Sequence, residues 1–247
     1  MSVAPITRLL ALAIVSVLAT ASGVLGATSA PTACEPRAKQ TCSEVVNWSG
    51  RNLTGVNLTN SSFRDASPGR SRFVATNFTR ANLTRTNFGD ANLTRANFTR
   101  AIVNGTGFRG KLTGTIFTGA KITASWAGAD FAGADFAGAR ITRFSAPRVN
   151  FTRANLAGTN LTDANLAGAN LRRADLTGVN LTGAKLAYAN LTGANLSGAN
   201  LSGALLRGAD LTRANFQGAT NFPRTGISGV TWSSTICPDG GVTTIGC

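Results

Sequence analysis

Four cysteines are the residues of this chain whose type and spacing most readily support covalent chemistry. Cys34 and Cys42 precede a long repetitive region, and Cys237 and Cys247 follow it. An even number of cysteines in a secreted chain is typical of disulfides. Three pairings are possible, and we favour the local one, Cys34 with Cys42 and Cys237 with Cys247, because the two pairs belong to opposite ends of the repeat. Neither spacing resembles a zinc site.

Residues for acid–base catalysis are scarce. The chain contains no histidine, the commonest general base, and only ten acidic residues. Asp130 and Asp135 occupy equivalent positions of successive repeats, so we expect them to point from adjacent faces, whereas the carboxylate pairs of glycoside hydrolases lie across one cleft. We therefore predict that the protein is not an enzyme and that it holds neither a metal nor a cofactor.

Positive charge is the strongest remaining chemical signal. The chain has 24 basic and ten acidic residues, a formal net charge of +14. Such charge can attract an anionic partner, or it can simply keep a leucine-rich protein soluble. It is concentrated from position 64 to position 111, where only Asp65 and Asp90 oppose it. The candidate anion-binding residues are Arg64, Arg70, Arg72, Arg80, Arg85, Arg95, Arg100, Arg109 and Lys111.

A five-residue period, from about Trp48 to about Cys237, must position these side chains. Its central position, i, is Leu or Phe; i−2 is small, i−1 is mostly Asn or Asp, and i+1 and i+2 are Thr, Ser, Gly or Arg. A period of five fits neither a helix nor a long strand, but it fits a short extended segment followed by a tight turn. Positions i and i−2 then line the inside of a coil, and we expect the Asn side chains to support the turns.

The motif, as in Ala154-Asn155-Leu156-Ala157-Gly158, resembles that of the pentapeptide-repeat family, Ala-Asn/Asp-Leu-x-x. The resemblance covers roughly three quarters of the chain. It implies an all-β fold, a right-handed parallel β-helix of square cross-section with four pentapeptides in each coil. The repeat is long enough for about nine coils, ~4.8 Å apart. The tail, residues 230–240, resembles the ending of exported actinobacterial members of the family.

With four repeats in a coil, residues about twenty apart are expected to stack. The period shortens by one residue at two places and lengthens by one at a third: between Phe108 and Leu112, Ile122 and Trp126, and Phe216 and Phe222. Once these shifts are counted, like residues share a face, as ladder packing favours: Phe78, Phe98, Phe117 and Phe136, and separately Val103, Ile122 and Ile141. A third face carries Pro68, Ala146 and Pro147, and we interpret it as weakened because proline donates no backbone hydrogen bond.

The N-terminal residues are expected to form a separate segment. Arg8 precedes an apolar run, Leu9 to Leu18, and Ala19-Thr20-Ala21 follows as a small-x-small cleavage site, which is typical of a Sec-type signal peptide. An uncleaved membrane anchor is the alternative, because no charge occurs between Arg8 and Glu35. The protein is then secreted or held at the cell envelope. The predicted segments are a signal peptide (1–21), an N-terminal segment and cap (22–45), the β-helix (46–232) and a C-terminal cap (233–247).

Two tryptophans, Trp48 and Trp232, occupy inward positions beside the cysteines. An open end of a β-helix exposes its lumen and its unpaired strand edges. We predict that each tryptophan plugs the lumen and that each disulfide ties a capping loop over it. Members of the family that dimerise often do so through a terminal helix, and no helical periodicity follows Phe216. The resemblance therefore implies a monomer.

Three functional hypotheses remain. The first is a non-enzymatic exported scaffold whose basic N-terminal coils bind an anionic envelope polymer, an acidic lipid or an acidic protein. The second is a purely structural spacer. The third comes from the family resemblance, because some cytosolic members are topoisomerase-binding DNA mimics; the +14 charge and the export signal disfavour it, since mimicry needs an acidic rod. Inward phenylalanines leave no stacking platform, so we do not expect specific nucleic-acid binding.

Overall fold

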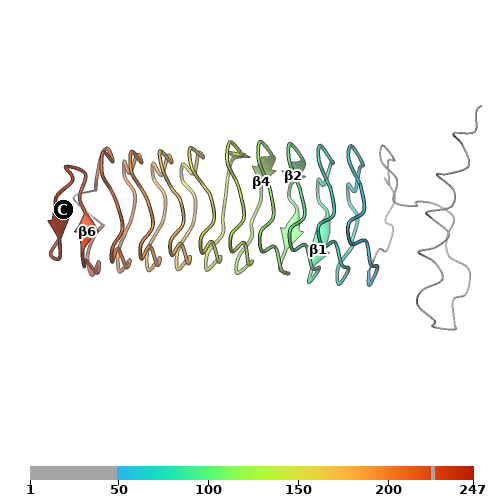
Figure 1. Cartoon of the computed structure of the whole chain (residues 1–247), viewed down its shortest axis with the longest axis horizontal. Coiled ribbons are helices and arrows are strands. Elements are labelled where there is room, and N and C mark those ends of the chain that lie inside the picture. The colour runs from blue at the N-terminus through green and yellow to red at the C-terminus, as the bar shows by residue number, and fades with distance from the viewer. Residues whose placement is uncertain (1–48, 224–225) are drawn as a thin grey trace, which may run out of the picture. The chain divides into compact units, whose positions relative to one another are not determined.

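The computed structural model describes residues 49–223 and 226–247. The described residues all belong to one compact unit, Cys34–Cys247. In that unit the backbone forms a series of stacked coils, and no helix occurs among the described residues (Figure 1). The predicted signal peptide, Cys34, Cys42 and Trp48 lie outside them, and the prediction of about nine coils, which extends beyond them, stays a prediction.

The strands are short segments that pair between coils. Strands β2, β4 and β5 form one parallel sheet, and β1 pairs in parallel with β3. Elsewhere single parallel bridges join position i−1 of one coil to position i−1 of the next, as between Asn57 and Asn77. The strands are β1 (Asn87–Gly89), β2 (Ile102–Asn104), β3 (Gly107–Phe108), β4 (Lys121–Thr123), β5 (Arg140–Ile141), β6 (Thr235–Ile236) and β7 (Val242–Thr243).

The pairing register confirms four repeats in each coil. Most bridge partners are twenty residues apart, as for Asn57 and Asn77. The offset falls to nineteen from Asn92 to Lys111 and rises to 21 from Asp210 to Thr231. The predicted register shifts are therefore confirmed, and the stack continues through them.

We number the four sides of a coil in chain order, so that face 1 lies opposite face 3. Each face carries a column of inward residues at position i, one from every coil. In three successive coils these are Leu93, Leu112 and Phe131 on face 1; Phe98, Phe117 and Phe136 on face 2; Val103, Ile122 and Ile141 on face 3; and Phe108, Trp126 and Ala146 on face 4.

The backbone hydrogen bonds explain the period of five. The N–H groups of i and i+2 donate to carbonyls of the next coil and that of i−1 to the previous coil; Leu58 N, for example, lies 2.7 Å from Asn77 O. The N–H of the residue after the turn closes it on the carbonyl of i, as from Ala81 to Phe78 at 2.9 Å. The remaining amide, i+1, donates to the Asn side chain at i−1, as from Thr59 to Oδ1 of Asn57 at 3.1 Å. All five donors are therefore used, and the turn-supporting role of Asn is confirmed.

Aromatic rings fill the lumen of the early coils. Along face 2 the rings of Phe78, Phe98, Phe117 and Phe136 are stacked, with centroids 5.1, 4.7 and 4.8 Å apart and interplanar angles of at most 11°. The predicted ladder is thus confirmed. From Leu156 to Leu211 every inward i position is a buried leucine. Because aromatic pairs contribute about 0.5–1.5 kcal/mol beyond their buried area, the early coils have an additional source of cohesion.

On face 4 the large inward side chain stands at position i in one coil and at position i−2 in the next. Trp126 is fully buried, and its Nε1 donates to the carbonyl of Thr106 at 2.9 Å. In the next coil the small residue, Ala146, stands at position i and the large one, Phe144, at i−2, with its ring centroid 5.3 Å from that of Trp126. The lumen therefore stays filled where the motif is broken.

The two prolines of face 4 do not have the same effect. Pro68 stands at position i, whose amide normally donates to the next coil, so it removes one hydrogen bond between coils. Pro147 stands at i+1, whose amide makes no bond between coils, and its carbonyl still accepts from Gly128 N at 3.0 Å. The interpretation of both prolines as weak points is therefore wrong for Pro147.

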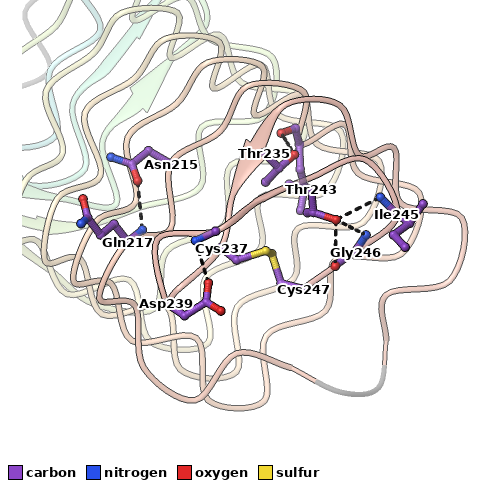
Figure 2. Close-up of a disulfide and its surroundings, with 11 residues drawn as sticks. Asn215, Gln217, Thr235, Cys237, Asp239, Thr243, Ile245, Gly246 and Cys247 are labelled. Atoms are coloured by element: carbon purple, nitrogen blue, oxygen red, sulfur yellow. Dashed lines mark hydrogen bonds between the residues drawn. A yellow bond between two sulfur atoms is a disulfide. The ribbon is translucent and has the colours of Figure 1, made fainter.

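The C-terminal end turns back in an antiparallel hairpin formed by β6 and β7. Cys237 occupies position i on face 2, but its amide donates to Gly241 O at 2.7 Å within the hairpin instead of to a further coil. The Cys237–Cys247 disulfide, with Cα atoms 5.5 Å apart, ties the last residue to this hairpin (Figure 2). The predicted pairing is confirmed for these two cysteines, and the hairpin protects part of the last strand edge.

Candidate anion-binding surface

Position i+2 places many of the outward arginines in left-handed backbone. The turn requires a positive φ at its third residue, and ten arginines adopt φ values between 50° and 60° there. A residue with a Cβ atom costs about 1–2 kcal/mol in this conformation, whereas glycine adopts it freely. Seven of the ten precede residue 151: Arg70, Arg80, Arg85, Arg95, Arg100, Arg143 and Arg148.

The arginine stems lie along the stack. A methyl group placed on Gly119 would sit 3.5 Å from Cγ of Arg100, one coil earlier, and one placed on Gly105 would sit 3.6 Å from Cγ of Arg85. Each of these aliphatic stems therefore leans over a glycine of the next coil. The guanidinium groups are carried on the outside, since the arginines are exposed.

The nine residues of the predicted basic surface are distributed over all four sides of the coil. Adjacent coils bring some of them together in pairs, but they do not form one continuous patch. Arg72 and Lys111 lie on face 1, Arg95 at the corner of faces 1 and 2, Arg80 and Arg100 at the corner of faces 2 and 3, Arg64 and Arg85 at the corner of faces 3 and 4, and Arg70 and Arg109 at the corner of faces 4 and 1.

Acidic side chains offset some of these cations. Arg85 forms a two-point contact with Asp65, one coil earlier, through Nε and through Nη2, which lies 2.8 Å from Oδ2. The Arg64 side chain also pairs with this carboxylate, at 3.4 Å. The hydrogen bond from Arg85 lowers the pKa of Asp65 and raises that of Arg85 in turn. At the corner of faces 4 and 1, Asp90 separates the coil of Arg70 from that of Arg109.

One edge of the stack carries cations without acidic neighbours. Arg80, Arg100, Lys121 and Arg140 come from four successive coils, at the corner of faces 2 and 3 or at the adjoining i−1 position of face 3. We call these four residues the basic strip. All four are exposed, and none takes part in an ion pair among the described residues. Across these coils neither this corner nor face 3 carries an acidic residue.

Two residues of the basic strip were missed from sequence, although a signal for them exists. The candidate set ended at Lys111, where the dense run of arginines ends. Lys121 and Arg140 are directly opposite each other in the β4–β5 pair. They follow the first register shift, so counting positions across it places both on the face next to Arg80 and Arg100.

Nothing in the described coils assembles a metal centre. No group of three or more His, Cys, Asp or Glu side chains lies together in residues 49–223 and 226–247. Within the same ranges no helical segment has the length and apolarity that a membrane span requires.

Trp232 lies at the end of the inward column of face 1, with its ring centroid 6.1 Å from that of Phe222 and its edge near Gly246. Its role as a plug stays a prediction.

Four-sided coils with parallel pairing between them define a parallel β-helix. Eight copies of the pentapeptide-repeat family model match residues 71–110, 150–186 and 189–220. These three segments therefore consist of pentapeptide repeats, which implies that the β-helix is right-handed. No match is found among curated proteins.

Several solved structures are similar to the chain. HetL, a pentapeptide repeat protein involved in heterocyst differentiation regulation from the cyanobacterium Nostoc sp. strain PCC 7120, is 28% identical over 80% of this chain and 93% of HetL, with a TM-score of 0.38. Full-length QnrB1, a plasmid-mediated fluoroquinolone resistance protein, is 22% identical over 74% of this chain and 92% of QnrB1, with a TM-score of 0.50. A pentapeptide repeat protein of the Arabidopsis thaliana thylakoid lumen is 33% identical over 40% of this chain and 67% of its own, with a TM-score of 0.29. The similarity to QnrB1 supports the fold alone.

Proposed function

We propose that the protein is a non-catalytic, exported scaffold whose early coils, residues 49–150, bind an anionic partner. The observation that carries this proposal is the uneven distribution of charge along one regular backbone. The early coils contain fourteen basic and four acidic residues, whereas the later coils, residues 151–220, contain six and three. Since both regions are built from the same repeat, the repeat itself does not account for the difference.

The backbone position of the arginines argues against charge that only confers solubility. A soluble surface could be obtained with charged residues at i+1 or i−1, where the backbone is unstrained. Instead, seven left-handed positions of the early coils hold arginine, at a cost of about 1–2 kcal/mol each relative to glycine. A structural spacer gains nothing from this arrangement, whereas a scaffold that binds anions gains charge at its corners.

The export signal and the sign of the charge favour a partner outside the cell. The N-terminal pattern around Arg8 and Ala19-Thr20-Ala21 is that of a signal peptide. The Cys237–Cys247 disulfide fits the same oxidising environment. An anionic polymer of the cell envelope is then the natural partner, and imitation of DNA, which requires an acidic surface, is disfavoured.

Binding of the exported full-length protein to an immobilised linear polyanion tests this proposal. We expect retention at about 0.01 M salt, where the Debye length is ~30 Å, and release at about 1 M, where it is ~3 Å. An uncharged matrix of the same pore size is the control. Passage through both matrices at low salt would favour the spacer and refute the proposed function.

A further inference from the structure

We propose that the partner is a linear phosphate polymer that lies along the basic strip, parallel to the axis of the stack. This inference rests on the proposed function and adds to it a place, a direction and a chemical class. The four cations of the strip come from consecutive coils, so they follow each other at the spacing of the coils, ~4.8 Å. Together they form a row of roughly 14 Å on one edge of the molecule.

The basic strip differs from several other basic groups in having no acidic residue beside it. Arg64 and Arg85 are engaged by Asp65, and Asp90 interrupts the corner that carries Arg70 and Arg109. Along the strip no carboxylate competes, so an anion placed there meets four unpaired cations in succession. Arg143, at the other corner of face 3, adds a further positive charge. Face 3 and both of its corners carry no acidic residue over the same four coils.

The side chains of the strip favour phosphate on a polymer backbone. A guanidinium presents paired N–H donors that match the oxygens of one phosphate group, and three of the four residues are arginines. In a linear phosphate polymer the charges belong to the main chain itself. Successive charges can therefore approach successive coils closely, which pendant carboxylates on longer side groups cannot do as readily.

The surroundings of the strip lack what other anionic partners use. The large exposed apolar side chains of the described coils and cap are Ile116, Tyr188, Leu205, Val242 and Ile245, and none lies on face 3. Face 3 therefore offers neither a wedge for insertion into a lipid headgroup layer nor an aromatic platform for nucleobases. Phosphate charge in a row is the feature that this face can recognise.

Two matched quadruple variants of the full-length protein test the strip. The first replaces Arg80, Arg100, Lys121 and Arg140 by Asn; the second replaces Arg72, Arg95, Lys111 and Arg153 by Asn on and beside face 1, the opposite face. Each removes two charges at i+2 and two at i−1, so the net charge stays equal between them. Asparagine is compatible with both positions, since Asn60 has a φ of 60° at i+2 and Asn57 supports its turn from i−1.

The probe is a linear inorganic polyphosphate, with polyglutamate and anionic lipid vesicles as comparison ligands. We expect the strip variant to bind polyphosphate on the order of a hundred-fold more weakly, and the slope of log affinity against log salt to flatten by about 3, since each phosphate contact of a single-stranded polymer contributes about 0.7. The face 1 variant should keep most of the affinity. Equal losses in both variants would overturn the strip and leave the proposed function standing.

The comparison ligands separate the remaining outcomes. Binding to polyglutamate or vesicles with no preference for polyphosphate would overturn the phosphate assignment but not the proposed function. Failure of the unmodified protein to bind any of the three at low salt would refute both. A chemical footprint on the unmodified protein gives evidence that does not depend on variant folding: polyphosphate should slow acetylation of Lys121 more than that of Lys185, a lysine of the later coils on face 4, and equal protection would count against the strip.

Discussion

The early and the later coils share one backbone and differ in nearly everything it carries. Residues 49–150 hold stacked aromatic rings inside and arginine outside, and both shortened repeats fall among them. Residues 151–220 hold leucine at all inward i positions except Phe151 and Phe216, glycine at most left-handed positions, and an uninterrupted period. In a solenoid each coil interacts mainly with its neighbours, so the two regions can differ this much without disturbing each other. The contrast separates what the fold requires from what this protein has added to it.

Removal of the central ring should distinguish the two interiors most strongly. Trp126→Ala should lower the free energy of unfolding by about 3–5 kcal/mol, because the side chain contacts five other rings and its removal leaves the Thr106 carbonyl unpaired. Leu186→Ala, in the same inward column of face 4, should cost less, about 2–3 kcal/mol. Denaturant unfolding of both variants checks this. Equal losses would mean that the aromatic lumen gives no additional cohesion.

A register shift should be less tolerant of a side chain than a regular turn. Gly110 lies at the first shortened repeat, where a Cβ atom would approach the Ala91 carbonyl oxygen to 1.9 Å. Gly110→Ala should therefore cost about 3 kcal/mol or more. At Gly198 of the later coils nothing lies within 4 Å, so Gly198→Ala should lose only the left-handed backbone term, about 1–2 kcal/mol. Thermal unfolding compares them, and a mild Gly110→Ala variant would show that the shift can relax.

Exchange of Arg and Gly at one corner should show how much stability the early coils lose by carrying arginine at left-handed positions. Arg100 and Gly198 both occupy the left-handed position at the corner of faces 2 and 3. Arg100→Gly should raise stability, and Gly198→Arg should lower it, each by about 1 kcal/mol. Chemical denaturation of the two variants measures both. A loss of stability in Arg100→Gly would instead show that the contact of the arginine stem with Gly119 outweighs the backbone strain.

Two aspartates should respond to salt in different ways. Arg85 lowers the pKa of Asp65. Burial raises the pKa of Asp210, but hydrogen bonds from Thr212 and Thr192 outweigh burial and lower it overall. Because both folded pKa values lie below the unfolded value, both groups stabilise the protein above pH ~4 and lose that contribution as pH falls through the folded pKa. NMR titration at rising salt should move the pKa of Asp65 upward more than that of Asp210, since ion pairs between exposed groups are screened.

The sequence predicts the fold well because every coil repeats the same physical solution. The period identified the coil, and the places where it shortens or lengthens predicted which rings stack, as for Phe98 and Phe117. The surface was harder to predict, because a cluster in sequence, such as Arg64 to Lys111, is spread by a twenty-residue coil over four sides. Residues far apart in sequence, such as Arg80 and Arg140, then share an edge. Position 110 has no room for a side chain, and Phe144 fills the space that Ala146 leaves at position i. Both facts depend on distances between coils, which the sequence does not contain.

The β6–β7 hairpin also bears on how long this protein can become. Coils that stack in parallel at ~4.8 Å have the backbone spacing along which amyloid fibrils grow. A bare last coil would offer a second molecule a ready template at its growing end. In the hairpin the chain reverses direction, and the Cys237 amide donates its hydrogen bond to the Gly241 carbonyl. The hairpin therefore presents an antiparallel edge, which a further parallel coil does not match. We therefore expect this hairpin to oppose end-to-end association of the protein, and the disulfide to Cys247 to hold the hairpin in place.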